Sequence, residues 1–144
     1  MPKILQLKPP PQYVPTEWQE QVAVFQWRMW AQKEEPSLRL LFASLNGVRV
    51  SIGLAHKMKQ SGMVSGVPDL ILPCARNGYF GLFIELKREK RGVVSDAQEQ
   101  FIRDLRAEGY FVAVARGAND AIAYLKSYLA LPRTRVIHEL ESKR

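Results

Sequence analysis

The first stretch of helical periodicity follows a run of prolines. Thr16 and Gln19 have the spacing of a capping box, in which each side chain binds the other residue's backbone amide. An apolar face recurs behind them at intervals of three or four residues: Trp18, Val22, Phe25 and Met29. This pattern predicts a helix over residues 17–32, which ends before Pro36.

The middle of the chain has the pattern of strands. Residues 68–73 and 79–87 are two apolar runs on either side of Asn77-Gly78, and an Asn-Gly pair between apolar runs is a strong hairpin signal. We therefore expect the two runs to pair as antiparallel strands. Residues 38–44 predict a short strand before them, and residues 51–61 predict a short helix that ends at Gly62.

The last third alternates helix and strand. Ser95 and Gln98 form a second capping-box pattern, and Gly109 stands where a C-terminal helix cap belongs. The apolar face of this predicted helix is Ala97, Phe101 and Leu105. A valine-rich strand over 110–116 follows, and then a helix whose apolar set is Ala121, Ile122, Leu125, Tyr128 and Leu129.

The predicted order is αβββαβ with one further helix at the end. A helix lies between the third and fourth strands, so these two are expected to run parallel through a right-handed crossover. Because the apolar faces of helices and sheet must be buried against one another, we expect an α/β fold with a mixed central sheet flanked by helices on both sides. We expect three segments: a proline-rich arm at 1–15, a folded domain at 16–131 and a basic tail at 132–144.

Composition narrows the class of protein. A chain of 144 residues with 47% hydrophobic and 24% charged residues is typical of one globular domain. No apolar run approaches the roughly 20 residues that cross a bilayer, so no membrane partner is expected. Cys74 is the single cysteine, which excludes an internal disulfide or a cysteine cluster and suits a reducing, cytoplasmic setting. The net charge of +7 indicates either a solubilising surface or a polyanionic partner, of which nucleic acid is the commonest.

The hairpin brings together residues that can perform chemistry. It places Asp69 near Glu85, and strand alternation puts Glu85 and Lys87 on one face with Leu86 on the other. Mg²⁺ prefers carboxylate and other oxygen ligands, so the two acids and the main-chain carbonyl of Leu86 are candidate ligands. A bound cation of this kind can activate a water molecule to attack a phosphodiester bond, and Lys87 would orient that water or help to deprotonate it. A solvated Glu-x-Lys pair of purely structural value is the competing interpretation.

These residues also carry a family resemblance. Pro68-Asp69 followed by Glu85-Leu86-Lys87 resembles the signature of the PD-(D/E)xK nuclease superfamily. More narrowly, the chain resembles a virus-type replication-repair nuclease (VRR-NUC) domain over about residues 16–129. The matching segments are residues 16–17, 20–21, 46–47, 62–70, 81–87, 95–98 and 105–110. Residues 115–117 depart from the pattern, because many relatives carry more basic residues there.

The resemblance implies a restriction-endonuclease-like core and a nuclease dependent on Mg²⁺ or Mn²⁺. It implies Asp69 and Glu85 as metal ligands, Lys87 as the catalytic lysine and an acid from the first helix that joins the site. Glu17 and Glu20 are both candidates for that acid, since they lie three apart on one helix face. Gln98 either contacts the site or serves only its capping box.

The remaining expectations concern partners. Two basic clusters flank the acids and are candidate DNA contacts: Arg49, Lys57, Lys59, Arg88, Lys90 and Arg91. The three tryptophans of the first predicted helix suit a dimer interface. Stand-alone relatives resemble Holliday-junction resolvases, which implies a homodimer, of bacterial or phage origin, that cuts branched DNA. The alternatives are a monomeric flap or nicking nuclease and a non-catalytic DNA-binding accessory protein.

Overall fold

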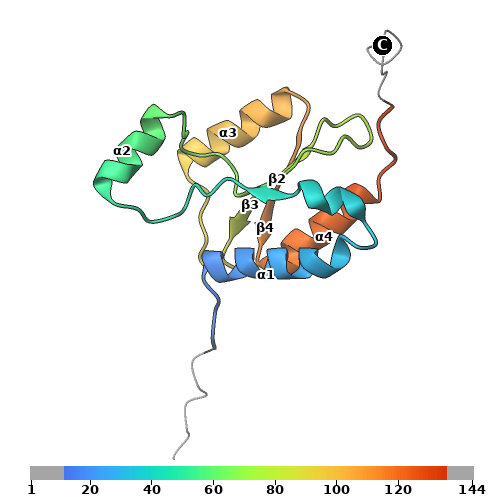
Figure 1. The fold of residues 1–144 in the computed structure, drawn as a ribbon, viewed down its shortest axis with the longest axis horizontal. Helices are drawn as coiled ribbons and strands as arrows, with labels where there is room; N and C mark the ends of the chain where they lie inside the picture. The colour runs from blue at the N-terminus through green and yellow to red at the C-terminus, as the bar shows by residue number, and fades with distance from the viewer. Residues whose placement is uncertain (1–11, 136–144) are drawn as a thin grey trace, which may run out of the picture.

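The computed structural model describes residues 12–135, and its centre is a four-stranded sheet with the order β1-β2-β3-β4 (Figure 1). The strands are β1 (Phe42–Ala43), β2 (Leu70–Leu72), β3 (Leu82–Lys87) and β4 (Phe111–Arg116). β1, β2 and β3 pair antiparallel, whereas β3 and β4 run parallel. The predicted α/β fold with a mixed sheet is confirmed. Most of the predicted arm and tail, residues 1–11 and 136–144, lies outside the described residues.

The predicted hairpin joins β2 to β3. Its turn is Asn77-Gly78, and both residues have positive φ angles, of 48° and 84°. Such a turn needs two residues that tolerate the left-handed region, which is why Asn-Gly is the preferred pair. The register matches Leu70 with Ile84, so the two acids that flank these positions lie at the same end of the hairpin.

Helices cover both faces of the sheet, as predicted. α1 (Glu17–Ala31) and α4 (Ala118–Leu129) pack against each other on one face, and α3 (Asp96–Ala107) lies on the other (Figure 1). Both predicted capping boxes are present, at Thr16 with Gln19 and at Ser95 with Gln98. These two local contacts fix where α1 and α3 begin. Both helices begin beside the end of the hairpin that carries Asp69 and Glu85, which we call the acidic end.

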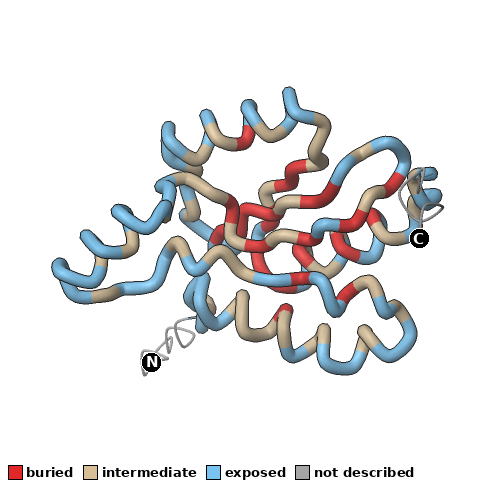
Figure 2. The backbone as a smooth tube through the Cα atoms, turned by 45° about the horizontal axis from the view of Figure 1, so that its top comes forward, coloured by how far each residue is buried: buried red, intermediate tan, exposed pale blue. Residues whose placement is uncertain are grey.

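The core lies between the sheet and the α1–α4 pair, where the buried positions concentrate (Figure 2). α4 buries the face that its sequence predicts, with Ala121, Leu125 and Tyr128 at its centre. The strands contribute five of the largest fully buried aliphatic side chains: Leu70, Leu72, Leu82, Ile84 and Leu86. Burial of side chains of this size stabilises the fold by roughly 1.5–3 kcal/mol each before entropy is counted.

Two sequence predictions are wrong in detail. The apolar face predicted for α1 is rotated, because Trp18 and Met29 are 69% and 64% exposed while Val24 is fully buried. The contact with α4 selects the face that includes Val24, whereas the pattern had favoured the larger side chains. On α3 the buried residue is Ile102, which lies beside the predicted face.

The strand predicted at 38–44 is also wrong in its extent. The segment Pro36–Leu40 is instead a 3₁₀ helix, η1, and only Phe42–Ala43 pair as a strand. The Glu35 side chain accepts a hydrogen bond from the Ser37 backbone, and Pro36 occupies the first helical position. This local cap outweighs the strand tendency of the apolar residues that follow.

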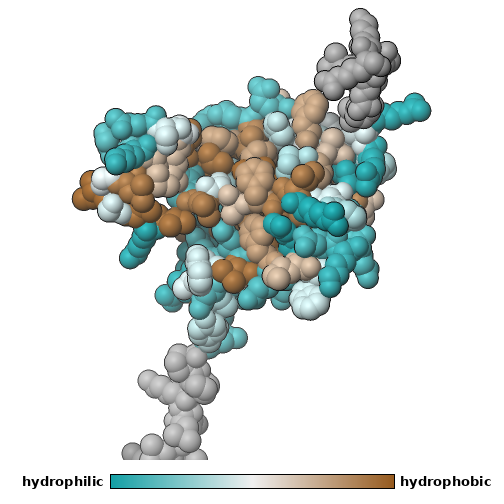
Figure 3. All heavy atoms as spheres, in the orientation of Figure 1, coloured by the Kyte–Doolittle hydropathy of each residue, from teal (hydrophilic) through white to brown (hydrophobic). Residues whose placement is uncertain are grey.

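The short helix predicted at 51–61 is present as α2 (Ile52–Gln60), and Gly62 after it has a φ of 107°. No residue of α2 is buried, and the helix projects from the sheet beside the acidic end (Figures 1 and 2). Apolar residues gather over this region of the surface (Figure 3). Ile52, the first residue of α2, is 90% exposed. No helix within residues 12–135 has the length and hydrophobicity to cross a membrane.

Candidate active site

The acidic end of the hairpin is tied together by a hydrogen bond between a side chain and the neighbouring strand. Asp69 directly precedes β2, and its Oδ2 accepts a hydrogen bond of 2.7 Å from the Leu86 backbone N–H. Leu86 lies between Glu85 and Lys87 on β3. This bond holds the Asp69 carboxylate against the strand that carries the other two predicted site residues.

Glu85 is the most buried acid of the described chain, at 1% exposure. Its Oε1 accepts a hydrogen bond of 2.6 Å from Gln98 Nε2 and lies 3.0 Å from Lys87 Nζ. Its Oε2 is buried and has no hydrogen-bond partner among residues 12–135. A buried polar atom without a partner costs free energy, so a ligand is expected at Oε2.

The pKa values of the two acids reflect this crowding. Burial is the main reason that the pKa of Glu85 rises to about 7, and the charge of Asp69 raises it further, while Lys87 opposes the rise. Burial also raises the pKa of Asp69, against the hydrogen bond from Leu86 and the charge of Lys87. The negative charge of Glu17 adds to both shifts. A cation at this position would favour the ionised form of both acids.

Asp69 and Glu85 both line one small cavity of about 220 Å³, which we call the acidic cavity. Glu17 lines this cavity together with Asp69, Glu85 and Gln98. Glu20 points elsewhere, since its Oε2 accepts a hydrogen bond of 2.7 Å from the Ala118 backbone N–H. Of the two candidate acids on the first helix, Glu17 is therefore the one that shares a cavity with Asp69 and Glu85.

The position of Glu20 has its own explanation. α4 begins after Gly117, which has no side chain to cap the helix. The first backbone N–H groups of a helix need acceptors and favour a negative charge. Glu20 reaches across from α1 and supplies that acceptor, so the metal-ligand role proposed for it is at odds with this geometry.

Gln98 performs both of the roles that the sequence left open. Its Oε1 accepts a hydrogen bond of 2.9 Å from Ser95 N, which completes the capping box of α3. Its Nε2 donates to Glu85 at the same time. The side chain therefore links the beginning of α3 to the buried acid.

Two further residues, Asn46 and Gly66, build the cavity wall and were not among the predicted site residues. Asn46 Nδ2 donates to the backbone oxygens of Val64 and Val67, which holds the loop that leads into Asp69. Gly66 has a φ of 90°, and a Cβ there would lie 2.6 Å from the Ala97 oxygen, so no other residue fits against α3. The Asn46-Gly47 turn and the glycine before Pro-Asp were the signals available for these roles.

All six predicted DNA contacts are exposed: Arg49, Lys57, Lys59, Arg88, Lys90 and Arg91. Arg49 lines a second cavity that also includes Asp69, and Lys59 lines a hollow beside α2. Arg88 and Lys90 donate to Val14 O and Gln12 Oε1, so the segment before α1 lies over the loop after β3. The two basic clusters therefore flank the acids from α2 and from the β3–α3 loop.

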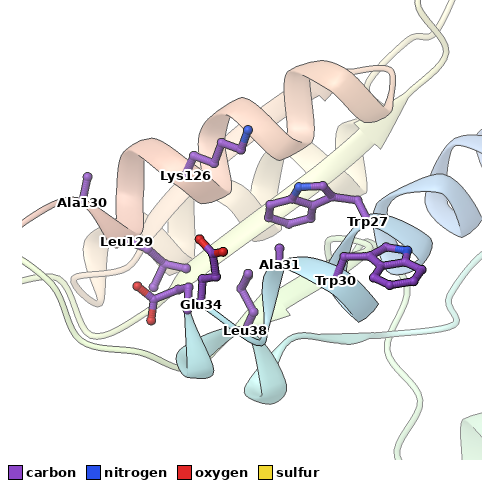
Figure 4. Close-up of a pocket in the computed structure, with 9 residues that line it drawn as sticks. Trp27, Trp30, Ala31, Glu34, Leu38, Lys126, Leu129 and Ala130 are labelled. Atoms are coloured by element: carbon purple, nitrogen blue, oxygen red, sulfur yellow. The ribbon is translucent and has the colours of Figure 1, made fainter.

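A larger hollow, of about 510 Å³, lies between α1 and α4 (Figure 4). Trp27 and Trp30 of α1 and Lys126 and Leu129 of α4 line it. It shares no lining residue with the acidic cavity. The carboxylates meet in the smaller cavity, which is therefore the candidate active site.

The donor set fits a hard divalent cation. Within residues 12–135, no three acidic, histidine or cysteine side chains are already drawn into a closed ligand set. Mg²⁺ does not need one, because it takes one or two carboxylates and completes its shell with water and substrate phosphate. Asp69 and the free Oε2 of Glu85 match that requirement.

Comparisons with known proteins identify the family and agree with the fold. Residues 11–119 match the VRR-NUC domain family. A solved structure described as a VRR_NUC domain protein superposes with a TM-score of 0.70 and 29% identity, covering 93% of this chain and 100% of that one. No curated protein matches the chain at a significant level. Because the family match covers most of the chain and the fold agrees with that of the solved structure, the chain belongs to the VRR-NUC domain family, which implies a nuclease function in DNA processing.

Proposed function

We propose that this nuclease is a Mg²⁺- or Mn²⁺-dependent endonuclease that hydrolyses phosphodiester bonds in branched DNA. Asp69, Glu85 and the main-chain carbonyl of Leu86 would hold the cation. The observation that carries the proposal is the Oε2 of Glu85, a carboxylate oxygen that is buried at the cavity and has no partner among the described residues. Most buried side-chain polar atoms in proteins have a hydrogen-bond partner, so an unpaired carboxylate oxygen at a cavity favours a bound ligand.

Each residue of the cluster has a distinct task in this proposal. A bound cation would polarise the phosphate and activate water. Lys87, whose side chain is 7% exposed and ion-paired with Glu85, would hold the attacking water and oppose the charge that develops on the phosphate. Gln98 fixes the orientation of Glu85 through its amide. Glu17 would join the cation through water from the edge of the cavity.

The DNA-binding surface would extend on both sides of the acids. Arg49, Lys57 and Lys59 would track phosphates on the α2 side, and the lysine and arginines after β3 on the other. The chain keeps all three residues: Asp69 is bonded to the Leu86 N–H, and Glu85 is ion-paired with Lys87. This favours an enzyme over a non-catalytic accessory protein. The intracellular DNA that it would cut makes the cytoplasm the expected compartment.

A homodimer is the assembly that we propose for cutting four-way junctions. Exposed apolar residues on α1 and α2 provide surface for it, including Met29, Trp30 and Ile52 at 64%, 71% and 90% exposure. Two active sites related by a two-fold axis would nick symmetrical strands of a junction. A monomer would instead suit a flap or nicking nuclease.

A substrate panel tests this proposal. A labelled four-way junction, a flap, a gapped duplex and a plain duplex would be incubated with Mg²⁺, Mn²⁺ or EDTA, with the mass in solution measured by light scattering. Paired nicks in the junction by a dimer of about twice the 16.5 kDa chain are expected. If a monomer cuts only flaps, the protein is a flap nuclease and the proposed junction activity is wrong. If the protein binds DNA but cuts none of the substrates with either metal, it is not an enzyme.

A further inference from the structure

A second cavity lies against the acidic one, and the function proposed above gives no role to Leu45 or Val48, which line it. Its volume is about 360 Å³, within the range of pockets that bind small ligands. It shares Glu17, Asn46, Gly47 and Asp69 with the acidic cavity. Any occupant of this second cavity therefore lies directly beside the two carboxylates.

One wall of the second cavity is Trp18, from the first turn of α1. This ring is 69% exposed, whereas Trp27 on the same helix packs against the core. Lys33 Nζ lies 4.7 Å from the centroid of Trp30, but within residues 12–135 neither a cation nor another aromatic ring stacks on Trp18. Trp18 therefore presents a free aromatic face next to the acids.

The other wall is the loop after β1. Leu45 and Val48 are 57% and 49% exposed and line the cavity together with Arg49. Leu45 has a positive φ of 58°, an uncommon conformation for a leucine, and Val48 N donates to Leu45 O at 3.3 Å across the turn. The loop thus holds two aliphatic side chains and one guanidinium at the rim of the cavity that Trp18 also lines.

We propose that this second cavity binds one unpaired nucleotide of the DNA, next to the phosphate that is cut. The base stacks on Trp18 and contacts Val48, and Arg49 pairs with the phosphate of that nucleotide. This inference rests on the proposed function, because it needs a DNA strand in the acidic cavity. The inference also names the substrate feature that the site would recognise, which is an unstacked base at the branch.

Charge and continuity favour a nucleotide over a protein segment. A ligand that enters both cavities must combine a flat apolar group with an anion that a cation or Arg49 can bind, and a nucleotide does so. A base inside a duplex is stacked on its neighbours and cannot stack on Trp18. The site would therefore select branch points, gaps and flaps, where bases are already unpaired, over continuous duplex.

The chain supplies a matched control for the test. Trp30 lies on the same helix with a similar exposure of 71%, but it lines the hollow between α1 and α4 (Figure 4). Affinities would be measured by fluorescence anisotropy in EDTA for a duplex with a three-nucleotide gap and for the same duplex with only a nick. The readout is the ratio of the two affinities, so a change that weakens all DNA binding leaves it unaltered.

Trp18→Ala is expected to lower the gap-to-nick affinity ratio by about 5- to 150-fold, the range of one lost base–aromatic stack. Trp18→Phe should keep most of the ratio, and Trp30→Ala should change it by less than about twofold. An unchanged ratio in Trp18→Ala would overturn the inference. A monomeric Trp18→Ala with a normal ratio would also overturn it, because Trp18 would then serve the dimer. If the alanine variant unfolds, Trp18→Leu replaces it, with the same two outcomes.

The binding test and the cleavage test can fail separately. A ratio that depends on Trp18 in a protein that never cuts DNA would refute the proposed nuclease mechanism and keep the nucleotide site. If the protein cuts DNA only with metal and the gap-to-nick affinity ratio does not change in Trp18→Ala, the mechanism stands and the nucleotide site is refuted.

Discussion

Gln98 and Glu85 are joined by a hydrogen bond of 2.6 Å from the Gln98 amide to Glu85 Oε1. The same glutamine closes the capping box of α3 through its own Oε1. The position of a buried acid on β3 is therefore set by the residue that starts the next helix. With Oε1 engaged in this way, Oε2 is the oxygen left for a ligand.

Variants of this pair separate helix capping from the site. Gln98→Glu keeps a capping-box residue but replaces the amide donor with a second acid beside Glu85, so the cleavage rate should fall at least about tenfold. Ser95→Ala removes the cap and leaves the Gln98–Glu85 contact, so it should cost about 1 kcal/mol of stability with little change in rate. Single-turnover cleavage and thermal melts measure the two effects. Equal loss of rate in both variants would show that Gln98 acts only through the helix.

The two acids of α1 should have opposite phenotypes. Glu20→Ala leaves the Ala118 N–H without its acceptor and should destabilise the fold by about 1–2 kcal/mol. Glu17→Ala removes an exposed side chain at the cavity, so it should reduce metal-dependent cleavage and leave the melting temperature near that of the wild type. Denaturant unfolding and cleavage would be measured on both. If Glu20→Ala is as stable as the wild type but cannot cut DNA, Glu20 acts in the active site and not as the cap of α4.

The raised pKa of Glu85 predicts how stability depends on pH without metal. The folded protein holds the Glu85 proton up to a pKa of about 7, whereas the unfolded chain releases it near the ordinary value of 4.5. The folded state therefore binds more protons between these values, and this stabilisation is lost as pH rises through 7. In EDTA the melting temperature should fall between pH 5 and pH 8, and Mn²⁺ should restore it at pH 8.

Glu85→Gln is the control for that titration, because its amide cannot release a proton. Its melting temperature in EDTA should fall less over the same pH range than that of the wild type. Asp69 titrates in both proteins, and its own pKa depends partly on a hydrogen bond with Glu85, so the difference between the two curves reports Glu85 together with its coupling to Asp69. Parallel curves would mean that the environment of Glu85 does not penalise its charge.

Salt dependence tests the basic clusters. DNA affinity should fall steeply with salt, and each of Arg49→Gln, Lys57→Gln and Lys59→Gln should reduce the slope of log affinity against log salt by about one if it binds a phosphate. Lys33→Gln is the matched control, because Lys33 is exposed and lies over Trp30. A slope that only Lys33→Gln reduces would place the DNA on the other side of the molecule.

The features predicted well from sequence are those set by neighbours along the chain. The Asn77-Gly78 turn and the two capping boxes need only a few adjacent residues, and they fix the hairpin and the start of α3. The pairing of β2 with β3 then brings Asp69 to Glu85 without reference to the rest of the fold.

The features that sequence left open depend on distant contacts. Glu17 and Glu20 differ because Gly117, nearly a hundred residues later, leaves Ala118 N without a local cap. The buried face of α1 is selected by its packing on α4, which no spacing within α1 specifies. The free Oε2 of Glu85 likewise follows from the approach of α3, since Gln98 takes Oε1.

The central claim is that Asp69 and Glu85 form a metal-dependent catalytic centre. The most direct measurement is single-turnover cleavage of one labelled four-way junction across a Mg²⁺ titration, by the wild type and by folded Glu85→Gln. We expect the wild-type rate to rise from zero in EDTA to saturation, and the variant rate to fall by at least about a hundredfold at every concentration. A variant that cuts at the wild-type rate, or a wild type that cuts in EDTA, would contradict the claim.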